Sequence, residues 1–311
     1  MSVISRPKIA SMAVGSILAL FALQTAQAEE HFPPYQPGAT TGTPEGALPP
    51  PGVYFSTNFY LKNGDDVNNS GHDIGVKIQG AGVTPALLWV PGITILGAQY
   101  GVAIAQPYAL TNSDAQAIGG SSSISEGFYN LIIKPEELSW NLGHGNFISE
   151  SLNIYLPTGP FHHTGTSTNA KTYANNFTTF EPEFAYSYLG HGWDITLNNM
   201  IDFNTTNNVT HYHSGDVYNL DWTVAHQLGH FTLGLIGSYA QQFTDDTHFG
   251  KTVPNLFSPG YGNRYMFASV GALLQYHIHK VTFSIRYLPG IAGANSGKPN
   301  FVHFGVSMPI S

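Results

Sequence analysis

The sequence contains no cysteine, and charged residues make up only 10% of its 311 residues. Without cysteine, a disulfide framework, a lipid-modified cysteine and thiol catalysis are all excluded. Nine basic and nineteen acidic residues follow residue 28, which gives that part a formal charge of −10. A basic nucleic-acid footprint is therefore absent, and no nucleic-acid partner is expected. An exported chain without disulfides has to gain its stability from its size or from closure of a sheet.

Long apolar runs are missing as well. After residue 28 no stretch reaches the roughly eighteen apolar residues of a spanning helix, which excludes a helical membrane protein. What the chain has instead is 13% aromatic residues, 34 glycines and many Thr and Val residues. This composition favours β-strands.

The N-terminus has the three parts of a secretory signal. Arg6 and Lys8 supply positive charge, residues 9–23 are apolar, and Ala26-Gln27-Ala28 is a small-x-small cleavage pattern. We expect residues 1–28 to be a signal peptide and Glu29 to begin the mature chain. The alternative is an N-terminal membrane anchor, for which the apolar stretch is short.

Residues 29–52 are rich in Pro, Gly and Thr and end in Leu48-Pro49-Pro50-Pro51-Gly52. Such a stretch cannot be a central strand or a helix. We call it the leader and expect it to be either disordered or packed as a small plug.

From residue 53 onward, apolar and polar residues alternate with the period of a β-strand. In residues 193–204, for example, Trp193, Ile195 and Leu197 share one face while Asp194 and Asn198 share the other. Twelve segments show this pattern: 53–62, 74–90, 92–106, 125–139, 146–157, 177–188, 193–204, 216–226, 231–244, 265–278, 280–288 and 300–309.

The connections between these segments alternate in length. They are short after even-numbered segments, the shortest being Pro91 and His279 alone. They are long and polar after odd-numbered ones, as in 107–124, 158–176, 205–215, 245–264 and 289–299. Outer-membrane barrels have such short periplasmic turns and long extracellular loops. A secreted β-sandwich is the alternative, but its strands average about five or six residues and its loops have no reason to alternate.

We therefore predict an all-β fold in which residues 53–311 form a single transmembrane antiparallel β-barrel of about twelve strands in the cell outer membrane. Its implied partners are outer-membrane lipids and the barrel assembly machinery.

If the apolar faces meet lipid, the polar faces line the lumen, because a Lys or Arg at the lipid midplane costs about 2–4 kcal/mol. The residues then expected to line the lumen are Glu181, Glu183, Asp194, Asp202, Asn219, Asp221, Lys280 and Arg286. They can form a structural network that fills a narrow lumen, or they can line or gate a solute path. The sequence leaves both interpretations open, because twelve strands lie between filled and open barrels.

No cofactor, metal or catalytic site is expected. The histidine pairs His211/His213 and His277/His279 have no zinc-site spacing. A calcium-like loop begins at Asp66, but Lys77 stands where a bidentate Glu is needed. Neither a Gly-x-Ser-x-Gly elbow nor a His-Glu-x-x-His motif occurs.

An ordered set of short motifs resembles the family described as "putative MetA-pathway of phenol degradation", whose members are transporter-like outer-membrane barrels often encoded near aromatic-catabolism enzymes. The motifs are residues 48–52, 156–159, 179–182, 192–194, 202–204, 214–216, 220–222, 241–246 and 286–287. The resemblance covers nearly the whole mature chain. It implies uptake of small hydrophobic or aromatic solutes, and it carries over no catalytic residue.

Three functions follow as hypotheses. The first is a channel or transporter for small hydrophobic or aromatic compounds, with a link to aromatic catabolism. The second is an outer-membrane barrel hydrolase that acts on lipids, because a Ser/His pair from separate strands has no local signature. The third is a structural or adhesive surface barrel, which predicts a fully plugged lumen.

Overall fold

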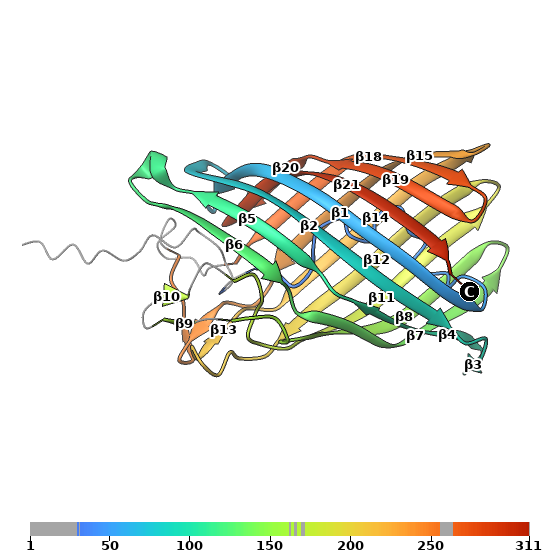
Figure 1. Ribbon diagram of the computed structural model, residues 1–311, viewed down its shortest axis with the longest axis horizontal. Helices are drawn as coiled ribbons and strands as arrows, with labels where there is room; N and C mark the ends of the chain where they lie inside the picture. Colours follow the sequence, from blue (N-terminus) through green and yellow to red (C-terminus); the bar gives the residue numbers. More distant parts are fainter. Residues whose placement is uncertain are drawn as a thin grey trace, which may run out of the picture.

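A single closed β-barrel of twelve long antiparallel strands forms the body of the protein (Figure 1). The computed structural model describes residues 30, 32–161, 163–164, 167–168, 172–255 and 264–310, so the expected signal peptide lies outside the described residues. The prediction of an all-β barrel with about twelve strands is confirmed. The barrel strands are β1 (Gly52–Val67), β2 (Asp73–Val90), β4 (Ala98–Ala105), β7 (Leu131–Gly143), β8 (Asn146–Leu156), β11 (Thr179–Gly190), β12 (Trp193–Asn204), β14 (Val217–Leu228), β15 (Phe231–Gln242), β18 (Met266–Ile278), β19 (Val281–Leu288) and β21 (Ser296–Pro309).

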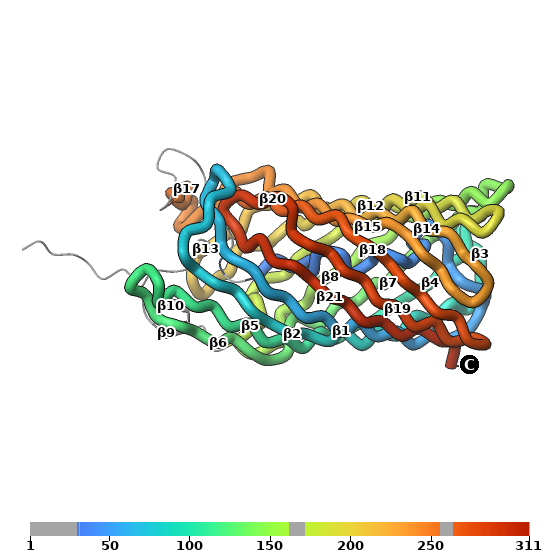
Figure 2. Tube along the Cα trace, turned by 90° about the horizontal axis from the view of Figure 1, so that it is seen from above, coloured from blue at the N-terminus to red at the C-terminus, as the bar shows by residue number. Residues whose placement is uncertain are grey.

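The first and last strands close the ring. β1 pairs with β21 along its length, from Tyr54 opposite Pro309 to Val67 opposite Ser296. On its other side β1 pairs with β2, which in turn pairs with β4 over residues 86–89 (Figure 2). A closed sheet leaves no long row of unpaired backbone groups facing lipid, which is the condition for crossing a bilayer with strands. This closure excludes the β-sandwich alternative.

Tight turns join the strands at one end of the barrel. β7 and β8 are connected by His144-Gly145, and β11 and β12 by His191-Gly192. Both residues of each turn have positive φ, between 52° and 82°, as the type I′ turns of two-residue hairpins require. Histidine is among the few non-glycine residues that adopt such angles comparatively often. These histidines are therefore explained by backbone geometry, and the short turns place this end at the periplasm.

The opposite end carries the longer connections, and here the strands extend further than predicted. The stretch predicted as a loop over 107–124 contains β5 (Tyr108–Asp114), the short 3₁₀ helix η1 (Gln116–Ile118) and the first residues of β6 (Ser122–Phe128). The rest of β6 falls in the predicted strand 125–139, which the structure divides between β6 and β7. β4 and β5 pair with successive parts of β2. Gln106 and Pro107 separate the end of β4 from the start of β5. Pro107 has no N–H to donate to the ladder, which explains the interruption.

Two other boundaries differ from the prediction. The third barrel strand begins at Ala98 and not at residue 92, because β3 (Thr94–Ile95) folds back on the start of β4. The predicted loop 289–299 is partly strand, since β20 (Gly290–Ala294) pairs with β18 after a break at Pro289. The remaining short strands are β9 (His163–Thr164), β10 (Ser167–Thr168), β13 (Tyr212–His213), β16 (Thr247–His248) and β17 (Lys251–Thr252).

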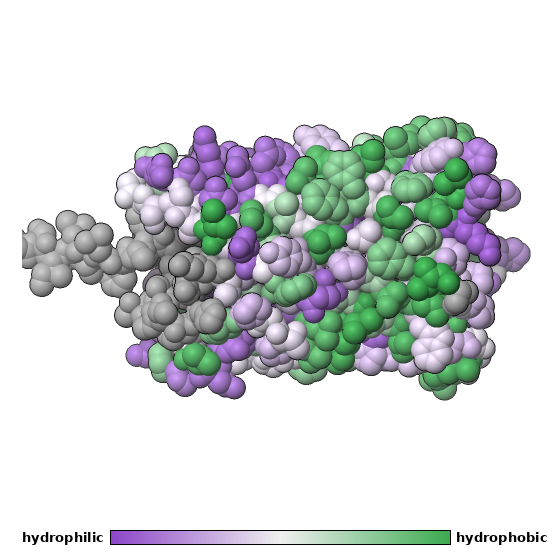
Figure 3. Space-filling view, viewed as in Figure 1, coloured by the Kyte–Doolittle hydropathy of each residue, from purple (hydrophilic) through white to green (hydrophobic). Residues whose placement is uncertain are grey.

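The outer wall of the barrel is apolar. Leu197, Leu235 and Phe283 are among many large hydrophobic side chains that are exposed on the strands. Figure 3 shows apolar groups over much of the barrel wall on the visible face, with hydrophilic groups concentrated toward the two ends. Within the described ranges, no helix has the length and hydropathy needed to cross a membrane. The exposed apolar wall is the surface that an outer-membrane barrel presents to lipid.

Candidate functional site: the lumen and the leader

Residues 32–51, the described part of the leader, run lengthwise inside the barrel (Figures 1 and 2). Near the loop end, the Phe32 carbonyl accepts a hydrogen bond from Asn175 Nδ2 at 2.8 Å. Near the turn end, the Pro49 carbonyl accepts one from Gln99 Nε2, also at 2.8 Å. The contacts in between come from inward-facing side chains of the barrel strands. Leader and lumen therefore form one structural unit.

Asp221 of β14 holds one turn of the leader through four hydrogen bonds. Its carboxylate accepts from the Tyr35 hydroxyl at 2.5 Å, from the Gly38 N–H at 3.2 Å, and from both the N–H and the hydroxyl of Thr40 at 3.1 and 2.9 Å. The carboxylate is buried, and multiple donors are what a buried charge needs in order to be tolerated. Asp221 is thus an anchor for residues 35–40.

Arg286 of β19 holds the same turn from another side. One guanidinium nitrogen donates to the carbonyls of Gly38, Ala39 and Thr41 at 3.0, 3.1 and 2.7 Å. The other terminal nitrogen donates to Asn58 Oδ1 of β1 at 2.6 Å. The planar fork of the guanidinium allows one side chain to bind several oxygens at once. Arg286 therefore ties the leader to the barrel wall.

Serine hydroxyls hold the part of the leader closer to the turn end. Ser187 accepts from the Gly46 N–H at 2.9 Å, and Ser139 donates to the Gly46 carbonyl at 2.8 Å. Ser149 donates to the carbonyl of Glu45 at 2.7 Å. Small hydroxyl side chains let the leader backbone approach the wall closely while still satisfying its polar groups. The leader is thus bound along its length and not at one point only.

A buried ionic cluster lies beside these serines. Lys134 Nζ of β7 is 3.1 Å from Glu183 Oε2 and 3.3 Å from Glu137 Oε2. Glu183 also accepts hydrogen bonds from Asn198 at 2.6 Å and Ser151 at 3.0 Å. Lys134 lies between the two carboxylates, and the further hydrogen bonds to Glu183 help to offset the cost of removing these charges from water.

A second acidic group lies further toward the loop end. Glu181 accepts from Asn153 at 2.8 Å and from the Tyr155 hydroxyl at 3.2 Å, while Asp202 accepts from Asn219 at 2.8 Å. Glu181 and Asp202 are both fully buried. Neutral donors from adjacent strands bind both carboxyl groups, which also lie within hydrogen-bonding reach of each other.

The structure brings most of the predicted lumen residues together. Glu181, Glu183, Asp202, Asn219, Asp221 and Arg286 are buried and face the interior. Asp194 is half-buried near the turn end and accepts from Thr196 Oγ1 at 2.6 Å. Lys280 does not join them, because it is exposed in the turn between β18 and β19 and lies outside both strands.

Sequence reasoning missed Lys134 and Glu137. Residues three apart should lie on opposite faces of a regular strand. A register shift between Ile133 and Glu136 places both on the inner side, as a β-bulge does when it adds a residue to one strand. Pro135 between them was the one signal that could have suggested the irregularity.

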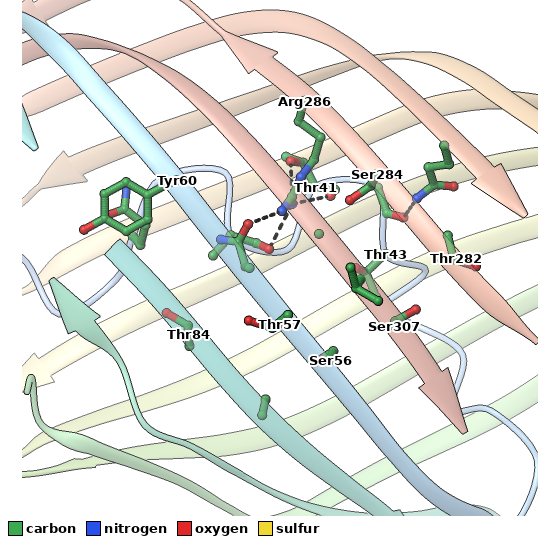
Figure 4. A pocket seen from close by; sticks show the side chains of 18 of the residues that line it. Thr41, Thr43, Ser56, Thr57, Tyr60, Thr84, Thr282, Ser284, Arg286 and Ser307 are labelled. Atoms are coloured by element: carbon green, nitrogen blue, oxygen red, sulfur yellow. Dashed lines mark hydrogen bonds between the residues drawn. The ribbon is translucent and has the colours of Figure 1, made fainter. Parts of the chain in front are cut away.

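The leader does not fill the lumen. A cavity of about 690 Å³ remains between residues 33–44 of the leader and the wall. On the wall side it is lined by small and hydroxyl-bearing inward residues of β1, β2, β19 and β21, and Arg286 reaches across to Thr41 (Figure 4). These wall residues include Ser56, Thr84, Thr282, Ser284, Gly305 and Ser307. The cavity also reaches the turn at His191 and Gly192, at the periplasmic end.

Among the residues that the structure describes, no group of three or more His, Asp or Glu side chains is arranged to hold a metal ion. His277 illustrates the alternative, since its ring nitrogens are hydrogen-bonded to the hydroxyls of Thr232 and Thr282. Histidines of this barrel serve turns and wall contacts.

The closed shell, the apolar outer wall and the cavity beside the leader define an outer-membrane β-barrel of the channel type. The chain belongs to the family described as "Putative MetA-pathway of phenol degradation", whose model matches residues 57–299. This match confirms the resemblance that the sequence motifs indicated.

One solved structure shows the same fold, and two others are similar to a lesser extent. An outer membrane channel from Pseudomonas putida F1 superimposes with a TM-score of 0.70 at 13% identity, covering 84% of this chain and 96% of that one. The transport unit of the Escherichia coli autotransporter AIDA-I has a TM-score of 0.49 at 9% identity, with 84% and 90% covered. The β domain of the Bordetella autotransporter BrkA has a TM-score of 0.46 at 11% identity, with 83% and 100% covered. No curated protein matches the chain.

Proposed function

We propose that this barrel is a channel for the uptake of small hydrophobic or aromatic compounds across the outer membrane, linked to aromatic catabolism. The observation that carries the proposal is the cavity of about 690 Å³ beside the leader. Ligand sites of small molecules typically have volumes of about 300–1,000 Å³. The cavity reaches the periplasmic turns, which suits a compound on its way inward.

The leader acts in this proposal as a plug that narrows the lumen. Asp221 and Arg286 fix its central turn. The part closer to the turn end, at Glu45 and Gly46, is fixed by three serines, Ser139, Ser149 and Ser187. A solute must then pass on the side of β1, β2, β19 and β21, where hydroxyls line the wall and none of the ion pairs among the described residues is formed. Such a path is too narrow for a general porin and favours small compounds.

The structural or adhesive barrel is the competing hypothesis. It requires a lumen that is filled throughout, and the open volume beside the leader speaks against it. The proposal further includes export through the signal at residues 1–28 and insertion by the barrel assembly machinery, which a processed N-terminus at Glu29 in isolated outer membranes would test.

Reconstituted protein provides the test of passage. We expect liposomes that contain the protein to show low ion conductance and to swell in small solutes more than in larger ones. Removal of residues 32–48 should raise the conductance severalfold, because the anchors are then left without the chain that they hold. Equal conductance with and without the leader would contradict its role as a plug. Permeability that matches protein-free liposomes for every small solute would contradict the channel itself.

A further inference from the structure

A second cavity of about 110 Å³ lies on the loop side of the first, between the outer part of the leader and β1, β2, β18 and β21. Aromatic side chains make up much of its lining: Phe32, Tyr173, Tyr265, Phe267 and Phe301. Each of them is at most 7% exposed. The cavity is thus lined largely by aromatic rings, and we call it the aromatic chamber, in contrast to the first cavity with its hydroxyl-lined wall.

The rings are arranged to present both faces and edges. Phe32 stacks on Tyr173 with their centroids 4.1 Å apart, and Phe267 meets Phe301 edge to face at 6.0 Å. Lys62 Nζ lies 5.6 Å from the centroid of Phe32. Offset stacking and edge-to-face contacts are the geometries in which aromatic rings attract one another. A further ring can enter this set in the same geometries.

Gln36 of the leader lies between the two cavities and lines both. Its Nε2 is buried and has no hydrogen-bond partner among the described residues. The neighbouring Tyr35, in contrast, is held by Asp221. A buried amide donor without an acceptor is costly for the folded protein, and so is an unfilled apolar cavity. A ligand with a ring and an acceptor atom would remove both costs.

We propose that the aromatic chamber binds a single-ring aromatic compound that carries an oxygen acceptor, such as a phenolic hydroxyl. The ring lies among Phe32, Phe267 and Phe301, and the oxygen accepts a hydrogen bond from Gln36 Nε2. The volume of about 110 Å³ is of the order of the roughly 150 Å³ of a dry cavity that holds benzene, so it limits the ligand to one ring. This inference rests on the proposed function: it gives the uptake path an outer recognition site, from which the solute passes Gln36 into the inner cavity.

Fluorine NMR on the full-length protein in lipid nanodiscs tests the site, with empty nanodiscs as the baseline for partition into lipid. The probes are para-fluorophenol and para-fluorotoluene, which differ in the oxygen that Gln36 would bind. We expect saturable binding of both. Gln36→Leu should lower the affinity for para-fluorophenol by up to about tenfold, because one hydrogen bond to the ligand is lost. The affinity for para-fluorotoluene should change by less than about twofold. Gln116→Leu, at an exposed position of η1, is the matched control and should change neither.

A measurement without any substitution complements the variants. Phenol should displace bound para-fluorotoluene from the wild-type protein, whereas cyclohexanol, which lacks the aromatic faces, should displace it far less. Three results would overturn the proposed site. Phenol and cyclohexanol could displace the probe equally well, Gln36→Leu could bind both fluorinated probes as tightly as the wild type does, or neither probe could bind saturably. Uptake of the same compounds by cells is measured separately. Uptake without saturable binding would therefore contradict the proposed binding site and support the channel. Saturable binding without uptake would support the binding site and contradict the channel.

Discussion

Asp221 and Arg286 hold opposite polar groups of the same leader turn. Asp221 accepts from the Gly38 N–H at 3.2 Å, and Arg286 donates to the Gly38 carbonyl at 3.0 Å. The two residues are on β14 and β19, with β15 and β18 between them in the sheet order. A single residue, Gly38, is thereby fixed through its N–H and its carbonyl to two parts of the wall. The position of the leader, and with it the width of the path beside it, depends on this clasp.

Arg286→Ala should widen the path. The substitution removes the donors to the carbonyls of Gly38 and Thr41 and leaves them without their charged partner. We expect a severalfold rise in single-channel conductance and a loss of stability of about 3 kcal/mol. Arg264→Ala is the control, because Arg264 forms an exposed ion pair with Asp245 and should change stability by less than about 1 kcal/mol. Unchanged conductance of Arg286→Ala would show that the clasp does not set the path.

The clasp also predicts non-additivity. Asp221→Ala and Arg286→Ala should each release the same leader turn. The loss of stability in the double variant should therefore be smaller than the sum of the losses in the two single variants. The coupling energy should lie between about 0.5 and 3 kcal/mol, the range of residues that share a partner. A double-mutant cycle in urea unfolding from detergent micelles measures it. Strict additivity would mean that the two residues act on the leader independently.

Lys134→Met should destabilise the barrel strongly. It leaves the buried carboxylates of Glu137 and Glu183 without their common cation, and breaking a buried pair in this way costs about 3–5 kcal/mol. Adding Glu183→Gln should restore part of the loss, because one of the two charges is removed. Urea unfolding gives both values. Lys280→Met, in an exposed turn, is the matched control and should stay within about 0.5 kcal/mol of the wild type.

How far the sequence specified the fold is clear at β12 and at β5. The alternation over 193–204 has the same bounds as β12. One face of this strand meets lipid and the other meets polar groups, so the polarity of each residue indicates the face on which it lies. β5 and the start of β6 lie in the stretch 107–124, which was predicted as a loop. The four residues 111–114 are all polar, so the apolar and polar alternation is lost there although the burial of β5 still alternates.

The lumen was predictable in its residue types and not in its contacts. Alternation placed Asp221 and Arg286 on inner faces, but it could not show that both bind Gly38, because register and closure of the barrel decide which inner residues meet. Lys280 had the right parity and lies in the turn, since the chain reverses one residue later than predicted. The leader showed no periodicity at all. Its path through the lumen is specified by partners on the strands and not by its own sequence pattern.

Passage beside the leader is the central claim, and a bulky side chain in that path tests it most directly. Ser307 of β21 lines the cavity, while Met308 is the next residue on the opposite face of the strand. Uptake of a radiolabelled single-ring aromatic compound is measured in cells that carry the wild type, Ser307→Trp or Met308→Trp at equal levels of folded barrel. The account predicts uptake close to that of cells without the protein for Ser307→Trp, and wild-type uptake for Met308→Trp. Wild-type uptake with Trp at position 307 would contradict it.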